Sequence, residues 1–304
     1  MRTVSWEEVD LDGARIDGLV RLWTGVLAWG ERAGRPYAAQ LTPDGTVLVA
    51  QVPGSGPVTS AMFNERFELV VGTPPTHLYG GMPGSEAPED HFDVAEWTVF
   101  EDPARLWLGC GDEDPIYVAT GPDGQLVAAE AGSGVLGVPS GIYVGPDIPL
   151  LVAGSEIGVY VAGVLRTGSV TGPQCWHCGN VEEPWDQRRL EPVPDGFTDV
   201  WEGFYPVIAG HRDGLPLLWN DDGNALDVPE VRLDESWPVV SVAAGPPVTT
   251  LALQSEDGPV LCTAGIDGWS SVDLPPGRLV VARADGADGD WIWVVIDGVL
   301  WTGA

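Results

Sequence analysis

GWSSVDL (residues 268–274) and SWEEVDL (residues 5–11) share the frame Trp-x-x-Val-Asp-Leu, although they lie at opposite ends of the chain. The first belongs to a longer unit, residues 249–277, which reads TTLALQSEDG, PVLCTAG and then GWSSVDLPPG after a two-residue turn. Near the C-terminus, WIWVVIDG (residues 291–298) and VLWTGA (residues 299–304) match the first two parts of this unit, and the third part is missing. The segment at residues 5–11 supplies it. A repeat shared between both ends predicts a closed ring of β-sheets, in which the first strand completes the last sheet.

Asp-Gly dipeptides recur along the chain and occur twelve times. Between runs of alternating apolar residues, Asp-Gly is the strongest short hairpin signal, because both central residues of a type I′ turn need a positive φ. Hairpins of this kind, together with two that use other turns, are centred near residues 44, 83, 123, 163, 213, 257 and 297. A period of about 40 residues is typical of four-stranded propeller blades.

The sequence therefore predicts an all-β fold, a single seven-bladed β-propeller over residues 1–304, closed by the N-terminal strand. In each blade, strands a to d run from the axis outward, and the marked turn joins b to c. The expected blades are residues 14–64, 65–102, 103–140, 141–195, 196–237, 238–277, and 278–304 together with 1–13.

The chain resembles, over essentially its whole length, the class of seven-bladed β-propellers that includes WD-repeat, Asp-box and kelch proteins. No blade combines the Gly-His start and the Trp-Asp end of a WD repeat. The segment GIDGWS (residues 265–270) resembles an Asp-box that is one residue short and lacks the leading Ser or Thr. The resemblance implies that sites lie at the mouths of the central channel, and it does not carry sialidase-like chemistry to this chain.

The chain is strongly acidic, with 45 Asp and Glu residues against 14 basic residues and a net charge of −31. All the basic residues are Arg, and Lys is absent. Nucleic acid is not an expected partner, because its backbone requires clustered cations. A basic protein is favoured electrostatically. The apolar runs are too short to span a membrane and the N-terminus has no signal core, so we expect a cytoplasmic monomer without a membrane partner.

The a–b and c–d connections open on one face of the ring and have irregular lengths, whereas the b–c turns are tight. Variable loops on a rigid scaffold are where binding residues concentrate. We therefore expect the binding site on the a–b and c–d face. The candidate ligand- or partner-binding residues are Trp176, His177, His77, Trp29, Asp112 and Asp114.

The segment GPQCWHCGN (residues 172–180) lies in the largest predicted insertion, residues 171–184. Its Cys-x-x-Cys spacing can chelate zinc, which makes Cys175, Cys178 and His177 candidate metal ligands. A redox dithiol activated by the intervening His is a second interpretation, and simple packing of the loop on the ring is a third. We expect no cofactor, with zinc as the alternative.

The sequence contains no Gly-x-Ser-x-Gly, His-Glu-x-x-His, P-loop or dinucleotide fingerprint. The leading hypothesis is a binding module that holds a basic protein or a small molecule on the a–b and c–d face. The alternative is an enzyme, a hydrolase, lyase or cyclase, at the mouth of the channel, with carboxylates and His177 as acid and base.

Overall fold

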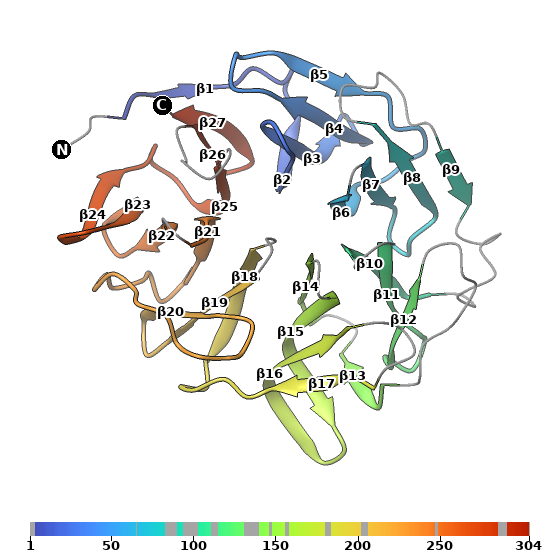
Figure 1. The fold of residues 1–304 in the computed structure, drawn as a ribbon. Coiled ribbons are helices and arrows are strands. Elements are labelled where there is room, and N and C mark those ends of the chain that lie inside the picture. The colour runs from blue at the N-terminus through green and yellow to red at the C-terminus, as the bar shows by residue number, and fades with distance from the viewer. Residues whose placement is uncertain are drawn as a thin grey trace.

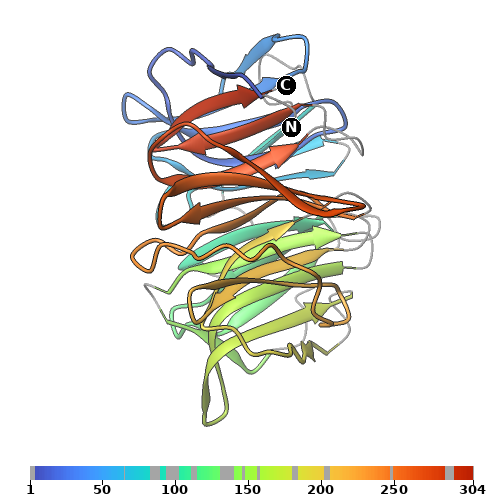
Figure 2. The ribbon, with the colours of Figure 1, turned by 90° about the vertical axis from the view of Figure 1, so that its left-hand side faces the viewer.

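The computed structural model describes residues 4–64, 66–82, 90–93, 103–110, 115–130, 140–145, 148–155, 158–179, 184–201, 206–246, 249–284 and 291–303. These residues form strands and turns. They include no helix, and therefore no helix long enough to cross a membrane. Seven sheets stand around a central opening, and the side view shows a flattened ring (Figures 1 and 2). The chain folds as a seven-bladed β-propeller, as its sequence predicts.

Each blade is one antiparallel sheet, and in every blade except blade 4 the strands follow one another outward from the axis in chain order (Figure 1). Blade 1 contains β2 (Arg15–Arg21), β3 (Val26–Arg32), β4 (Arg35–Leu41) and β5 (Val47–Ala50). Blade 2 contains β6 (Val58–Asn64), β7 (Arg66–Val71), β8 (His77–Gly81) and β9 (Asp90–Asp93). Blade 3 contains β10 (Arg105–Cys110), β11 (Pro115–Thr120) and β12 (Leu126–Glu130). Blade 4 contains β13 (Ile142–Val144), β14 (Leu150–Ser155), β15 (Gly158–Thr167), β16 (Val170–Cys178) and β17 (Asp186–Arg188), and both β13 and β14 pair with β15.

The remaining three blades complete the ring. Blade 5 contains β18 (Gly196–Trp201), β19 (Val207–Arg212) and β20 (Leu215–Trp219). Blade 6 contains β21 (Val240–Ala244), β22 (Thr250–Ser255), β23 (Gly258–Gly265) and β24 (Gly268–Asp273). Blade 7 contains β25 (Leu279–Ala284), β26 (Ile292–Ile296), β27 (Val299–Gly303) and, from the other end of the chain, β1 (Trp6–Glu8).

The predicted closure by the N-terminal strand is present in the structure. β1 pairs with β27 at the rim, so that Trp6 lies opposite Gly303 (Figure 1). The indole of Trp6 donates a hydrogen bond to the carbonyl of Asp273 in the neighbouring blade at 3.1 Å. Its counterpart in the repeat, Trp269, donates a hydrogen bond to the side-chain carboxylate of Asp227, in the segment after β20, at 2.8 Å. The shared frame therefore joins adjacent blades twice.

The hydrophobic core is divided among the contacts between neighbouring sheets. Seven clusters of buried side chains lie one at each junction, including the junction of blades 7 and 1, where Leu11, Ile16 and Trp293 meet. This arrangement explains why the inner strands are apolar on both faces: each is covered by a sheet on either side.

The inner strands are also joined by side-chain hydrogen bonds. β2, β6, β18, β21 and β25 each contain a β-bulge. A bulge turns a side chain out of the regular alternation. The hydroxyl of Ser60 accepts a hydrogen bond from the backbone amide of Leu108 on the next inner strand, at 3.2 Å. The hydroxyl of Ser241 accepts one from the amide of Ala282 in the same way, at 3.0 Å. These contacts hold the walls of the channel in place.

The strand assignment from the sequence is wrong in blades 1, 2 and 4. In blade 1 the b–c turn is Ala33-Gly34, with φ of 51° and 76°, and Asp44-Gly45 joins c to d. In blade 2 the b–c hairpin, expected near residue 83, is formed by β7 and β8 and turns between Val71 and His77. In blade 4 residue Gly163 lies inside β15, and the turn follows Thr167. In blade 1 the reason is that Asp-Gly closes both b–c and c–d hairpins, so the dipeptide does not say which one it marks. The markers in blades 2 and 4 were not Asp-Gly turns.

Candidate functional site

The segment with Trp176 and His177 is a strand and not an inserted loop. Both residues lie in β16, the third strand from the axis, opposite Val161 and Tyr160 of β15. The Trp176 indole packs on the core between blades 3 and 4 and donates a hydrogen bond to Gln174 at 3.0 Å. The additional residues of blade 4 lengthen the β15–β16 hairpin, because alternating apolar residues favour a strand over a loop.

His177 is held on the sheet away from the channel. Its ring lies 4.6 Å from the ring of Tyr160, and its Nδ1 atom lies 3.1 Å from a guanidinium nitrogen of Arg188. The enzyme hypothesis needs this imidazole at the mouth of the channel, next to carboxylates. The placement of His177 in that hypothesis is therefore wrong, because inner strands and not β16 line the axis (Figure 1).

Cys175 and Cys178 lie on opposite faces of blade 4. The Cys175 side chain is buried in the cluster between blades 4 and 5, and Cys178 is buried in the cluster between blades 3 and 4. Residues three apart in a strand point in opposite directions, since the side-chain period is two. The two sulfur atoms consequently do not converge on one point, as a zinc knuckle or a dithiol requires.

The buried thiols of Cys175, Cys178 and Cys262 are expected to resist alkylation in the native protein. Burial raises the pKa of Cys175 to about 12 and that of Cys262 to about 11, and the reactive form is the thiolate. Because an unfolded thiol ionises near pH 8.5, these groups stabilise the fold fully below that pH. Their contribution is lost as the pH rises toward 11 and 12.

The measurement is labelling with iodoacetamide at about pH 8, followed by peptide mapping, with protein unfolded in guanidinium as the control. Cys175, Cys178 and Cys262 should react only in the unfolded sample, since all three are buried and none is in a disulfide. Labelling of Cys175 without denaturant would contradict the strand placement.

The other candidate residues do not join Trp176 in one site. His77 begins β8 on the b–c side, where its ring lies 5.8 Å from that of Tyr79, so its predicted position on the opposite face is wrong. The cause is the shifted strand register in blade 2. Trp29 lies in the middle of β3, packed over Gly18 between blades 1 and 2. Asp112 and Asp114 lie outside the described residues.

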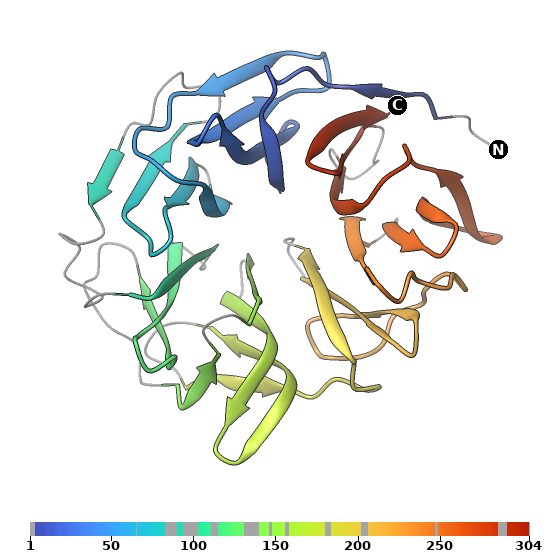
Figure 3. The same ribbon diagram turned by 180° about the vertical axis from the view of Figure 1, so that it is seen from behind.

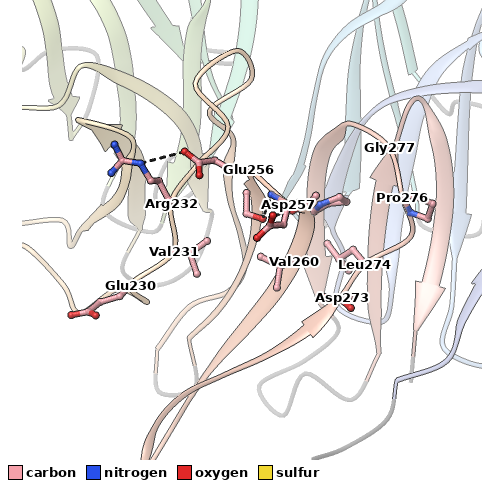
Figure 4. A pocket seen from close by; sticks show the side chains of 13 residues that line it. Glu230, Val231, Arg232, Glu256, Asp257, Val260, Asp273, Leu274, Pro276 and Gly277 are labelled. Atoms are coloured by element: carbon pink, nitrogen blue, oxygen red, sulfur yellow. Dashed lines mark hydrogen bonds and ion pairs between the residues drawn. The ribbon is translucent and has the colours of Figure 1, made fainter.

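A groove of about 650 Å³ opens on the b–c side, at blade 6 and its neighbours (Figure 4). Three segments form its walls: residues 230–232 after blade 5, residues 255–260 at the β22–β23 hairpin, and residues 273–277 between β24 and β25. We call it the acidic groove. Backbone hydrogen bonds fix the walls, because the amide of Glu256 donates to the carbonyl of Arg232 at 3.2 Å and that of Leu274 to Pro259 at 3.1 Å.

The acidic groove carries four carboxylates and one guanidinium. The carboxylates belong to Glu230, Glu256, Asp257 and Asp273. Arg232 lies 3.3 Å from Glu256, and both side chains are more than half exposed, so this ion pair is weak and screened by water. The remaining acids give the groove a negative potential that attracts cations. The sequence analysis missed this groove because the tight Asp-Gly turns on the b–c side leave few side chains in each turn. The Asp of the Trp-x-x-Val-Asp-Leu frame is the residue that could have indicated it.

A smaller hollow of about 260 Å³ repeats this geometry at the ring closure. Its walls are the Asp297-Gly298 turn and the segment from Glu8 to Arg15. Asp10 occupies the position that Asp273 holds in the acidic groove, in the second copy of the shared frame. Two segments line this hollow, whereas three line the acidic groove.

One carboxylate, that of Asp199, lies on the inner strands of blades 5 to 7 as the structure describes them, and it is neutralised by an arginine. Asp199 receives both terminal nitrogens of Arg283, at 2.8 and 2.9 Å, together with the hydroxyl of Ser241 and the amide of Val242. Asp199 comes from blade 5 and Arg283 from blade 7, so the pair spans blade 6. A carboxylate that accepts four donors is a structural link between blades.

Comparison with solved structures gives the same architecture. The chain is similar to the WD40 β-propeller domain of Doa1, with 13% identity, a TM-score of 0.60, and coverage of 99% of this chain and 97% of that one. It is also similar to streptogramin B lyase, with 11% identity, a TM-score of 0.63 and the same coverage. No protein-family model and no curated protein sequence matches the chain. At these identities the likeness defines the fold, which hosts both binding modules and enzymes.

Proposed function

We propose that this protein is a binding module whose acidic groove holds a cationic segment of a partner protein. The observation that carries the proposal is the groove itself, a hollow of about 650 Å³ with four carboxylates against one guanidinium. A partner segment rich in Arg or Lys would complement this charge.

The overall charge also favours a cationic partner. A net charge of −31 raises the local concentration of cations around the whole ring and speeds the association of a basic partner. It also opposes nucleic acid, which carries one phosphate charge per nucleotide. The rigid walls add to affinity, because a preformed groove pays little ordering entropy when the partner binds.

The described residues favour this role over catalysis. The enzyme hypothesis needs His177 at the mouth of the channel, and this residue lies on β16, the third strand from the axis. The carboxylate of Asp199, on an inner strand, is bound to Arg283. The acidic groove contains carboxylates that are largely solvent-exposed, a setting that suits the binding of a cation more than proton transfer.

The test is a titration with a fluorescent eight-residue peptide of alternating Arg and Ala, followed by anisotropy. We expect the double variant Asp257→Asn/Asp273→Asn to bind the peptide roughly threefold to tenfold more weakly, since exposed ion pairs contribute about 0.2–1 kcal/mol each. The matched control is Asp222→Asn/Asp267→Asn, which removes the same charge from exposed turns on the a–b and c–d side.

The control should bind within about twofold of the unmodified protein at 0.15 M salt, where charges beyond about 8 Å are screened. Equal losses in both double variants would mean that the peptide responds to net charge alone, and the proposal would fail. Raising the salt to about 0.5 M should weaken binding to the unmodified protein and reduce the difference between the variants.

A further inference from the structure

One guanidinium of the protein itself already lies in the acidic groove. The Nε atom of Arg232 lies 3.3 Å from a carboxylate oxygen of Glu256 (Figure 4). Residues 230–232 follow blade 5, and Glu256 belongs to the β22–β23 hairpin of blade 6, the next blade of the ring (Figure 3). Among the described residues, Arg232 is the one cation that lines the groove. In the free protein, one of the four groove carboxylates is therefore neutralised from within the chain.

The backbone of Arg232 is fixed beside the carboxylate that its side chain contacts. The carbonyl of Arg232 accepts a hydrogen bond from the amide of Glu256 at 3.2 Å. The next residue, Leu233, is buried, and its amide donates a hydrogen bond to the carbonyl of Gly214 at 2.9 Å. A tethered group acts at a high effective concentration, so the Arg232 side chain returns to Glu256 whenever their contact opens.

The side-chain contact between Arg232 and Glu256 opens easily. Their side chains are 58% and 56% exposed. Exposed ion pairs are weak, because water screens them and because holding two long side chains in one geometry costs conformational entropy. The Arg232 side chain can therefore leave Glu256 without disturbing the walls of the groove, which are joined by backbone hydrogen bonds.

The groove also has apolar surface for the stem of an incoming cationic side chain. Val231, Val260 and Leu274 line it beside the carboxylates (Figure 4). Long cationic side chains pack their aliphatic stems on apolar surface and keep the charged end in water. A partner's Arg or Lys that packs its stem on these residues competes with Arg232 for the carboxylate of Glu256.

We propose that Arg232 is an autoinhibitory residue of the acidic groove. It occupies Glu256 in the free protein, and a cationic side chain of the partner displaces it. This inference rests on the proposed function, because it needs a cationic partner in the groove. Binding then exchanges one ion pair for another at Glu256, and the other three carboxylates supply the net attraction. Removal of the Arg232 charge leaves Glu256 open and strengthens binding.

The first test is the anisotropy titration with the peptide of alternating Arg and Ala. We expect Arg232→Gln to bind the peptide roughly twofold to fivefold more tightly, since this variant loses no exposed ion pair when the peptide binds. The matched control is Arg189→Gln. The Nε atom of Arg189 lies 3.2 Å from Glu191, and neither residue lines the groove. The control should bind like the unmodified protein at about 0.15 M salt, where distant charges are screened.

The second test follows the Arg232 side chain itself by NMR. The chain contains 14 Arg residues and no Lys, so the protein labelled with ¹⁵N gives few side-chain Nε–Hε signals. The signal that the Arg232→Gln variant lacks belongs to Arg232. Saturating unlabelled peptide should shift this signal, because the Nε–H group leaves Glu256 for water, and should leave the Arg189 signal in place.

Two results would each overturn the inference. One is an Arg232→Gln variant that binds the peptide no more tightly than Arg189→Gln, when both melt like the unmodified protein. The other is an Arg232 signal that stays in place at saturation. If either result accompanies weaker binding by Asp257→Asn/Asp273→Asn, the groove keeps its proposed function and Arg232 is only part of its wall. Absence of peptide binding to the unmodified protein and to every variant would remove both proposals.

Discussion

Removal of residues 1–13 is expected to lower the melting temperature by roughly 10 °C or more and to cause aggregation. The deletion takes away β1 and the apolar side chains of Trp6, Val9 and Leu11, which pack at the ring closure. Burial of such side chains contributes about 1.5–3 kcal/mol each, and a chain of this size loses a few degrees per kcal/mol. The deletion also exposes the free edge of β27, a template for pairing with other chains.

The control is rescue in trans. A synthetic peptide with residues 1–13 should raise the melting temperature of the truncated protein, and a scrambled peptide of equal composition should not. Calorimetry and light scattering report the two effects. A truncated protein that melts with the full chain would mean that the ring is held together without β1.

Replacement of Arg283 by Met is expected to destabilise the fold by about 3–5 kcal/mol, the usual cost of leaving a buried charge without its partner. Both side chains of the pair are 11% exposed, and Asp199 would keep only Ser241 and Val242 as donors. Denaturant unfolding measures the change.

The double variant Arg283→Met/Asp199→Asn separates charge from packing. A neutral amide needs no counterion and can still accept the bonds from Ser241 and Val242, so the double variant should recover part of the lost stability. If the single and double variants are equally unstable, the loss comes from the missing Arg side-chain contacts and not from the unpaired carboxylate.

The sequence predicts the ring and its closure because both depend on long-range repetition. The copy of the Trp-x-x-Val-Asp-Leu frame at residues 5–11 has one place to pair, beside β27, and the structure confirms it. Strand identity within a blade is a local matter and is harder to predict. Asp44-Gly45 and Asp297-Gly298 look alike in sequence, but the first joins c to d and the second joins b to c.

The candidate sites show why the functional residues were harder to predict from the sequence than the fold. Trp176 and His177 stand out in the sequence, yet pairing with β15 makes them part of a sheet. The acidic groove depends on segments from residues 230–232 and 273–277, which come together only because blades 5 and 7 flank blade 6. The contact between Arg21 and Trp201 joins blades on opposite sides of the axis. The repeat period of the sequence does not predict a contact of this kind.

The split last blade also determines when the ring can close during synthesis of the chain. Trp6 leaves the ribosome 297 residues before its partner Gly303, from residue 6 to residue 303. At about 5–20 residues per second, the first strand waits roughly 15–60 s for the hairpin on which it docks. During that interval six sheets can assemble in order, but the circle stays open and the N-terminal segment stays available to chaperones. Emergence of β27 is therefore the event that allows the ring to close.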